Sequence, residues 1–306
     1  MMNEELFAGI KVLVALAQAD GKIHENERAA IENAIDGSDL PEGETVSSLV
    51  ASTIDLDAEL ARIISVDART RTFDAASAIV FVDGETTDDE RAMLARVATA
   101  LGFEADDEGR SERFRRFTSA VPPANIEKLD DAKARLEATN NEIANAAAFS
   151  GALAESSLPV AAQSTVFTNN VRLARNIGLY YGHDADDAFW RTFVSNIVGT
   201  PASWFALRTL LSLVPGYGAA AAYATTWALG RATCLYFEEG ESIDHDALRR
   251  AFEKSKREGQ TAAKDARPTI DGRKEKIDAA RVSLDADLES GKLAETAYAD
   301  TLVAIA

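Results

Sequence analysis

The sequence predicts an all-α fold with two helical domains joined by a long helix. Apolar residues recur at helical spacing along most of the chain, and no segment alternates apolar and polar residues over the length of a strand. The 306 residues are rich in alanine and include only 7 prolines, which also favours helices. A chain of this length corresponds to about two domains.

Helical periodicity and glycine stops divide the N-terminal part into short helices. Leu6, Ile10, Leu13, Val14 and Ala17 trace one face of a first helix, and Gly37 and Gly102 mark helix ends. The remaining helices of this part are predicted around 30–36, within 40–53, and at 55–66, 71–82 and 88–101.

The rest of the chain changes character twice, which sets the predicted domain bounds. A charged hinge and a long alanine-rich helix over 126–154 follow the first bundle, and an apolar region begins near Thr165. After Glu238 the chain is charged again, and it ends as a helix, a Ser-Gly turn and a short helix. We therefore predict an acidic bundle, a hinge with the connecting helix, an apolar helical domain and a helical tail, at 1–104, 105–158, 159–260 and 261–306.

The charge is distributed unevenly along the chain, and its negative sign argues against one class of partner. The net charge is -18, so a nucleic-acid partner is not expected. Residues 1–104 hold 21 acids and 8 bases, whereas residues 165–237 hold 3 acids and 5 bases. The single cysteine, Cys234, and an acidic start without a basic leader favour a cytoplasmic setting.

One phrase occurs twice, as "ADGKIHENER" from Ala19 and "VDGETTDDER" from Val82. Each copy is an Asp-Gly turn followed by a new helix that begins with acids, which suit the helix dipole. The phrase also matches half of a calcium-binding EF-hand loop, but Leu16, Ile79 and Phe81 cannot supply the earlier oxygen ligands. The repeat therefore predicts one helix-turn-helix used twice.

The acids of the two copies are the candidate metal ligands. If the two turns lie close together, their carboxylates could bind a divalent cation such as Ca²⁺ or Mg²⁺. The alternative is that these acids cap helices and face solvent. The candidate residues are Asp20, Glu27, Asp83 and Glu90.

The segments "LVALAQADGKIHENERAAI" and "ASAIVFVDGETTDDERAMLARVATALG" resemble the TerB domain of tellurite-resistance and related stress proteins. The resemblance covers residues 1–104. It implies an all-helical bundle with two half-motifs and an acidic face, for which metal binding and scaffolding near membranes have been proposed, with no catalytic role. Only the four candidate acids carry over to this chain.

The second notable segment is "TLLSLVPGYGAAAAYATTWALG", whose 22 residues carry no charge. Its length would span a bilayer, but Pro215 and two glycines interrupt it, so a helical hairpin is predicted instead. Buried in a helical domain, the hairpin would be a core element. At a membrane or partner surface, its aromatic residues would be the contacts, and these are Trp204, Tyr217, Tyr223 and Trp227.

The segments "NIGLYYG", "LVPGYG" and "ALGRATCLYFEEG" resemble the YcjF-like apolar domain of unknown function, over roughly residues 160–260. That domain is usually described as membrane-associated and often follows a GTPase domain, whereas this chain has no G-x4-G-K-[ST] motif. The resemblance implies docking to a membrane or to partner helices.

Motifs for catalysis are weak or absent in the sequence. "PGYGAAA" fits a loose dinucleotide fingerprint but lacks a strand-helix setting, the histidines are scattered, and no G-x-S-x-G elbow occurs. Asp184, Asp186 and Asp187 are better explained by a helix start than by a metal.

We therefore expect no catalytic site and a non-enzymatic stress-response or envelope-associated adaptor. Its partners would be another protein, the inner face of the membrane, or both. The alternative is a soluble self-associating scaffold, a homo-oligomer with a fully buried hairpin.

Overall fold

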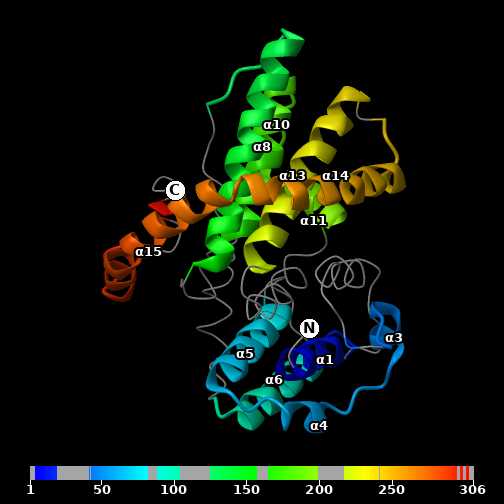
Figure 1. Cartoon of the computed structure of the whole chain (residues 1–306), viewed down its shortest axis with the longest axis vertical. Helices are drawn as coiled ribbons and strands as arrows, with labels where there is room; N and C mark the ends of the chain where they lie inside the picture. Colours follow the sequence, from blue (N-terminus) through cyan, green and yellow to red (C-terminus); the bar gives the residue numbers. More distant parts are fainter. Residues whose placement is uncertain are drawn as a thin grey trace. The chain divides into compact units, whose positions relative to one another are not determined.

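The computed structural model describes residues 4–18, 41, 43–81, 88–103, 125–156, 165–198, 217–240, 242–294, 297–298 and 301–302. Every regular element in these ranges is a helix (Figure 1), and none is a strand. The predicted all-α class is therefore confirmed. None of the helices in the described ranges combines the length and the apolar run that crossing a bilayer requires.

The chain forms two compact units. The first comprises residues 1–115 with 198–215, and the second comprises residues 116–197 with 216–306. The predicted connecting helix lies in the second unit, where it packs against three other helices. The predicted domain bounds stay a prediction, because contacts within one chain do not reveal which segment folds alone.

In the first unit α1 is the central helix, and α3 to α6 contact it (Figure 1). Leu6, Ile10, Leu13 and Val14 are buried as expected, but so are nearly all other positions of α1. The helix is therefore covered on most sides rather than on the one predicted face. The bounds are α1 Glu4–Ala17, α3 Val46–Ala51, α4 Leu56–Leu60, α5 Val66–Phe81 and α6 Asp88–Leu101.

The boundary between α4 and α5 differs from the prediction. α4 stops at Leu60, and α5 begins at Val66 instead of Arg71. The Glu5 carboxylate accepts hydrogen bonds from the backbone N–H groups of Ile64 and Ser65, both at 2.7 Å, and from the Ser65 hydroxyl at 2.8 Å. Ser65 in turn accepts from the Ala68 N–H at 3.3 Å, so it caps the start of α5.

In the second unit, α8, α10 and α13 pack against one another (Figure 1). Helix α14 packs along α13, and α15 packs against α8. The predicted C-terminal order of helix, Ser-Gly turn and further helical residues is present, with Gly291 at φ 70°. The bounds are α8 Ala132–Glu155, α10 Thr165–Tyr181, α11 Asp187–Val198, α13 Tyr217–Glu238, α14 His245–Asp265 and α15 Arg267–Glu289.

Two glycines permit close contacts between helices of this unit. A Cβ at Gly230 on α13 would lie 2.4 Å from the Ile143 side chain on α8. A Cβ at Gly259 on α14 would lie 2.9 Å from the Ala224 backbone on α13. Real Cβ contacts are not this short. The absence of a side chain at these two glycines therefore allows α13 to lie this close to α8 and to α14.

Two predicted elements fall outside the described residues. They are the helix around 30–36 and the part of the hairpin that precedes Pro215. The part that follows Pro215 is α13, a single helix that continues to Glu238.

Candidate functional site

Helix α13 carries the only predicted contact residues whose side chains the structure describes. Tyr223 is 4% exposed and stacks on Trp227, with ring centroids 5.9 Å apart. Burial is the main cause that raises the pKa of Tyr223, and the negative charge of Asp265 raises this pKa further. Trp204 and the Tyr217 side chain lie outside the described residues. The membrane or partner contact stays a prediction, and Tyr223 could not join it without movement of the helices that cover it.

Trp227 is placed differently from Tyr223. It is half-buried, and the Arg231 guanidinium lies 5.1 Å from the centre of its ring, in a cation-π contact. Arg231 also donates to Asn140 Oδ1 on α8 at 2.8 Å. The Trp227 indole N–H is buried and finds no hydrogen-bond partner among the described atoms. This aromatic-cation pair is therefore a partly exposed part of α13.

A buried polar chain links α8, α10 and α13. Asn169 is 1% exposed and uses both amide hydrogens, one to Ala146 O at 2.9 Å and one to Ser150 Oγ at 3.0 Å. Thr226 Oγ1 lies 2.8 Å from Asn170 Oδ1 and 2.9 Å from Ser150 Oγ. Thr226 has one hydroxyl hydrogen, which goes to Asn170 Oδ1, so Ser150 donates to Thr226.

The two ends of this chain are polar atoms without partners. Within the described part of the protein, Asn169 Oδ1 and Asn170 Nδ2 are buried and make no hydrogen bond, and the same is true of Thr165 Oγ1. Buried polar groups in this state cost free energy unless a partner or a solvent molecule satisfies them. The chain therefore has one acceptor end and one donor end on neighbouring residues of α10.

An aromatic cluster surrounds His183 at the end of the same unit. The rings of Phe189, Trp190 and Phe237 lie 5.2 to 5.7 Å from that of His183. A Cβ at Gly178 would come within 2.3 Å of the Trp190 ring, so this glycine admits the indole. Near this cluster, burial, then the charges of Cys234 and Glu238, raise the pKa of Tyr181 to about 12.

The acids of "GHDADDAF" serve the start of α11. Asp186 Oδ1 accepts from the Phe189 N–H at 2.8 Å, as a helix N-cap does. Asp187 Oδ1 lies 3.7 Å from Arg175 Nη1. This geometry agrees with the helix-start interpretation for Asp186 and Asp187.

The structure describes none of the side chains of the predicted metal ligands. Asp20, Glu27 and Asp83 lie outside the described residues, and Glu90 lies on α6 with a side chain that is not described. Among the side chains that are described, no group of three or more His, Cys, Asp or Glu could hold a metal ion. The metal site stays a prediction.

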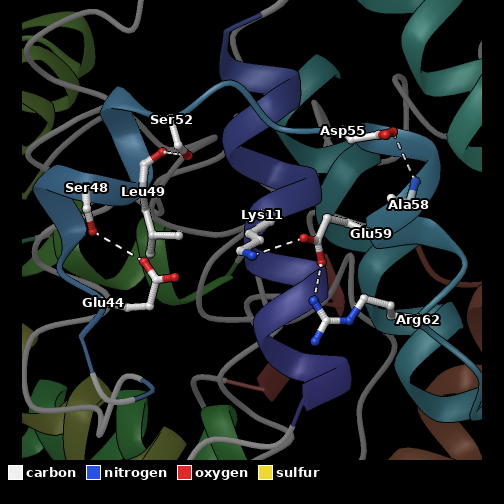
Figure 2. A network of polar contacts seen from close by, with 9 residues as sticks. All are labelled: Lys11, Glu44, Ser48, Leu49, Ser52, Asp55, Ala58, Glu59 and Arg62. Carbon is white, nitrogen blue, oxygen red and sulfur yellow. Dashed lines mark hydrogen bonds and ion pairs between the residues drawn. The ribbon is translucent and has the colours of Figure 1, made fainter.

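An ion-pair triad and several caps hold the first unit together (Figure 2). Glu59 bonds Lys11 Nζ through Oε1 at 3.0 Å and Arg62 Nη1 through Oε2 at 3.2 Å. Lys11 Nζ also lies 4.7 Å from the centre of the Phe7 ring. Asp55 caps α4 by accepting from the Ala58 N–H at 3.2 Å. The Lys11-Glu59 pair joins α1 to α4, and the other contacts are local.

Cys234 has the surroundings of an unreactive thiol. It is buried, and burial is the main cause that raises the pKa of its thiol to about 11. A hydrogen bond with Thr139 lowers this pKa by a smaller amount. Because the thiolate is the nucleophile, this residue is poorly suited to catalysis at neutral pH.

Sequence reasoning missed the buried polar chain. The available signal was the pair Asn169-Asn170 between the apolar residues Phe167 and Val171, since amides on a buried face need partners. Comparison with protein-family models, curated proteins and solved structures returned no match.

Proposed function

We propose that this protein is a non-enzymatic adaptor built from an acidic N-terminal bundle and an apolar-cored helical unit that docks a protein partner. The uneven charge supports the proposal, since residues 1–104 hold 21 acids and 8 bases and residues 165–237 hold 3 acids and 5 bases. The burial of α13 under α8, α10 and α14 limits how the second unit can dock. A helix packed this closely has little apolar surface left to offer. Docking then takes place through the outer faces of the unit rather than by release of the hairpin.

The proposal keeps both family resemblances as hypotheses. A TerB-like bundle over 1–104 and a YcjF-like unit over roughly 160–260 would together suit a stress-response or envelope-associated role. The cytoplasm, at or near the inner face of the membrane, is the proposed location.

Affinity purification of the full chain from its native cells, after mild cross-linking, tests the adaptor role. We expect one or a few proteins to co-purify at near-stoichiometric amounts, because an adaptor holds its partner by a specific interface. A chain that is recovered alone, and that also ignores vesicles, would contradict the proposal.

Membrane docking is the second candidate, and the Trp227-Arg231 pair favours it. Tryptophan and arginine side chains at a helix surface suit the boundary between lipid headgroups and acyl chains. The full chain should then co-sediment with vesicles that contain anionic phospholipid. Trp227→Ala should weaken this binding by about tenfold, the effect of losing one buried aromatic contact.

Val282→Ala is the matched control for that experiment. Val282 is also an apolar side chain, 73% exposed, but it lies on α15. Equal binding losses in the two variants, or no vesicle binding at low and high salt, would remove the membrane candidate. Circular dichroism should confirm that both variants are folded.

A divalent cation at the acidic repeat is the proposed ligand of the N-terminal bundle. Calorimetric titration with Ca²⁺, Mg²⁺ and Mn²⁺ would compare the natural chain with a variant that replaces all four candidate acids by alanine. The residues replaced are Asp20, Glu27, Asp83 and Glu90. Identical heats would rule out this site, whereas heat that only the natural chain releases would support it.

A further inference from the structure

Helix α10 places two buried polar atoms without partners on one of its faces. Thr165 and Asn169 are each 1% exposed, and within the described part of the chain neither Thr165 Oγ1 nor Asn169 Oδ1 makes a hydrogen bond. The two residues are four positions apart on the helix, a spacing that puts their Cβ atoms about 5–6 Å apart on the same face. An open hydroxyl and an open amide oxygen are therefore neighbours in the interior of the second unit.

Contacts with α8 fix the orientation of the Asn169 amide. Its two N–H groups donate to Ala146 O at 2.9 Å and to Ser150 Oγ at 3.0 Å. A flip of the amide would turn its oxygen toward the Ala146 carbonyl, and two acceptors would then face each other. Asn169 Oδ1 is thus an acceptor that needs a donor other than these two residues.

The chemistry of the pair suits a small neutral molecule that both donates and accepts. Such a molecule can donate to Asn169 Oδ1 and at the same time donate to or accept from the Thr165 hydroxyl. With hydrogen bonds of about 2.8 Å, one water molecule bridges oxygens that are up to about 5.6 Å apart. Two neutral oxygens would not offset the dehydration of a buried cation.

We propose that one internal water molecule bridges Thr165 Oγ1 and Asn169 Oδ1. This water donates to Asn169, which donates to Ser150. Ser150 in turn donates to Thr226, and Thr226 donates to Asn170 Oδ1. The water is therefore the first donor of the buried polar chain, in which every donor points the same way along the chain. Hydrogen bonds in this order polarise and strengthen one another.

Two other open polar atoms of α10 lie too far away to share this water. Asn170 Nδ2 belongs to a residue that is turned about 100° around the helix from Asn169, and Asn176 Oδ1 belongs to a residue about 10 Å further along it. Removal of the Thr165 hydroxyl therefore tests the bridging water by itself.

Magnetic relaxation dispersion of water tests the proposal, because it counts the water molecules that the full chain holds for longer than its tumbling time. Thr165→Val keeps the shape of the side chain and removes the hydroxyl, so the count should fall by about one. Thr165→Ser keeps the hydroxyl and should leave the count unchanged.

Thr233→Val is the matched control. Thr233 is also a buried threonine, but its hydroxyl already donates to Leu229 O at 2.8 Å within α13. This change should leave the count of long-lived water molecules as it is in the natural chain. Circular dichroism verifies that all three variants fold.

A crystal structure of the natural chain provides a second measurement that needs no variant. A water oxygen should lie within about 3.2 Å of both Thr165 Oγ1 and Asn169 Oδ1. A crystal structure without this water would overturn the proposal. The same holds for an unchanged count in Thr165→Val, or for an equal loss in Thr165→Ser or Thr233→Val.

Discussion

The Thr226 hydroxyl lies 2.8 Å from the Asn170 side-chain oxygen, where α13 meets α10 in the buried centre of the second unit. Asn170 is fully buried, and Thr226 also contacts Ser150 on α8. One threonine thus joins three helices. The contact gives α13, an alanine-rich helix, a specific register against its neighbours, because a shifted helix would leave these polar atoms without partners.

Thr226→Val should lower the free energy of unfolding by about 1–3 kcal/mol. Valine keeps the shape of threonine but removes the hydroxyl, so Asn170 Oδ1 and Ser150 Oγ lose a partner in a buried site. Urea unfolding followed by circular dichroism measures the change. Thr192→Val, at an exposed threonine that bonds only its own helix, should change stability by less than about 0.5 kcal/mol. Equal losses of stability in the two variants would show that the buried polar chain does not contribute to the free energy of unfolding.

Gly259→Ala should destabilise the second unit by about 1–3 kcal/mol, because the new methyl group would overlap the Ala224 backbone on α13. Gly272→Ala on α15 is the control. A Cβ there meets nothing within 4 Å, so this change should stabilise the helix by about 0.5–1 kcal/mol. Thermal unfolding compares the two variants. Opposite signs are expected, and a stable Gly259→Ala protein would mean that α13 and α14 can separate at little cost.

Glu5 should contribute stability that depends on pH. The Ser65 backbone N–H, then the Ser65 hydroxyl and the Ile64 N–H, lower the pKa of Glu5 in the folded protein. A carboxyl whose pKa is depressed by folding stabilises the protein above its unfolded pKa, and this contribution disappears as the pH falls through the folded pKa.

Glu5→Gln should therefore destabilise the protein on the order of 1 kcal/mol at neutral pH, a value reduced for the solvent around this site. The difference from the natural chain should shrink as the pH is lowered below the ordinary glutamate pKa of about 4.3. Urea unfolding between neutral and acid pH measures it. Glu4→Gln, at the exposed neighbour, is the control and should show no such trend. A difference that is independent of pH would refute the role of the Glu5 charge.

The Lys11-Glu59 pair should couple more strongly than the Arg96-Asp57 pair. Both have a nitrogen-oxygen distance of 3.0 Å, but the exposed fractions are 19% and 12% in the first pair and 57% and 74% in the second. Water screens the second pair, so its coupling free energy should be about 0.2–0.5 kcal/mol, against about 1 kcal/mol or more for the first. Double-mutant cycles with Lys11→Met and Glu59→Gln, and with Arg96→Met and Asp57→Asn, measure both.

Local signals predicted most of the helices. Helix α6 matches the expected 88–101, and Gly102, with φ 82°, ends it as a helix-stop glycine should. The start of α5 was missed because Ser65, which caps it, is bound by Glu5, a residue 60 positions away in the sequence. Periodicity cannot detect a partner at that distance. The candidate metal acids stay a prediction.

The sequence by itself determined the all-helical class, the helix stops and the uneven charge, because helix propensity, periodicity and charge are properties of neighbouring residues. Tertiary structure alone decided how α13 is covered and which polar groups meet beneath it. The hydrogen bonds that link Thr226 with Asn170 and with Ser150 join residues 56 and 76 positions apart. Such contacts form only where the helices lie close together. Gly230 and Gly259 allow this close approach because they have no side chain, and their effect is visible only in the packed structure.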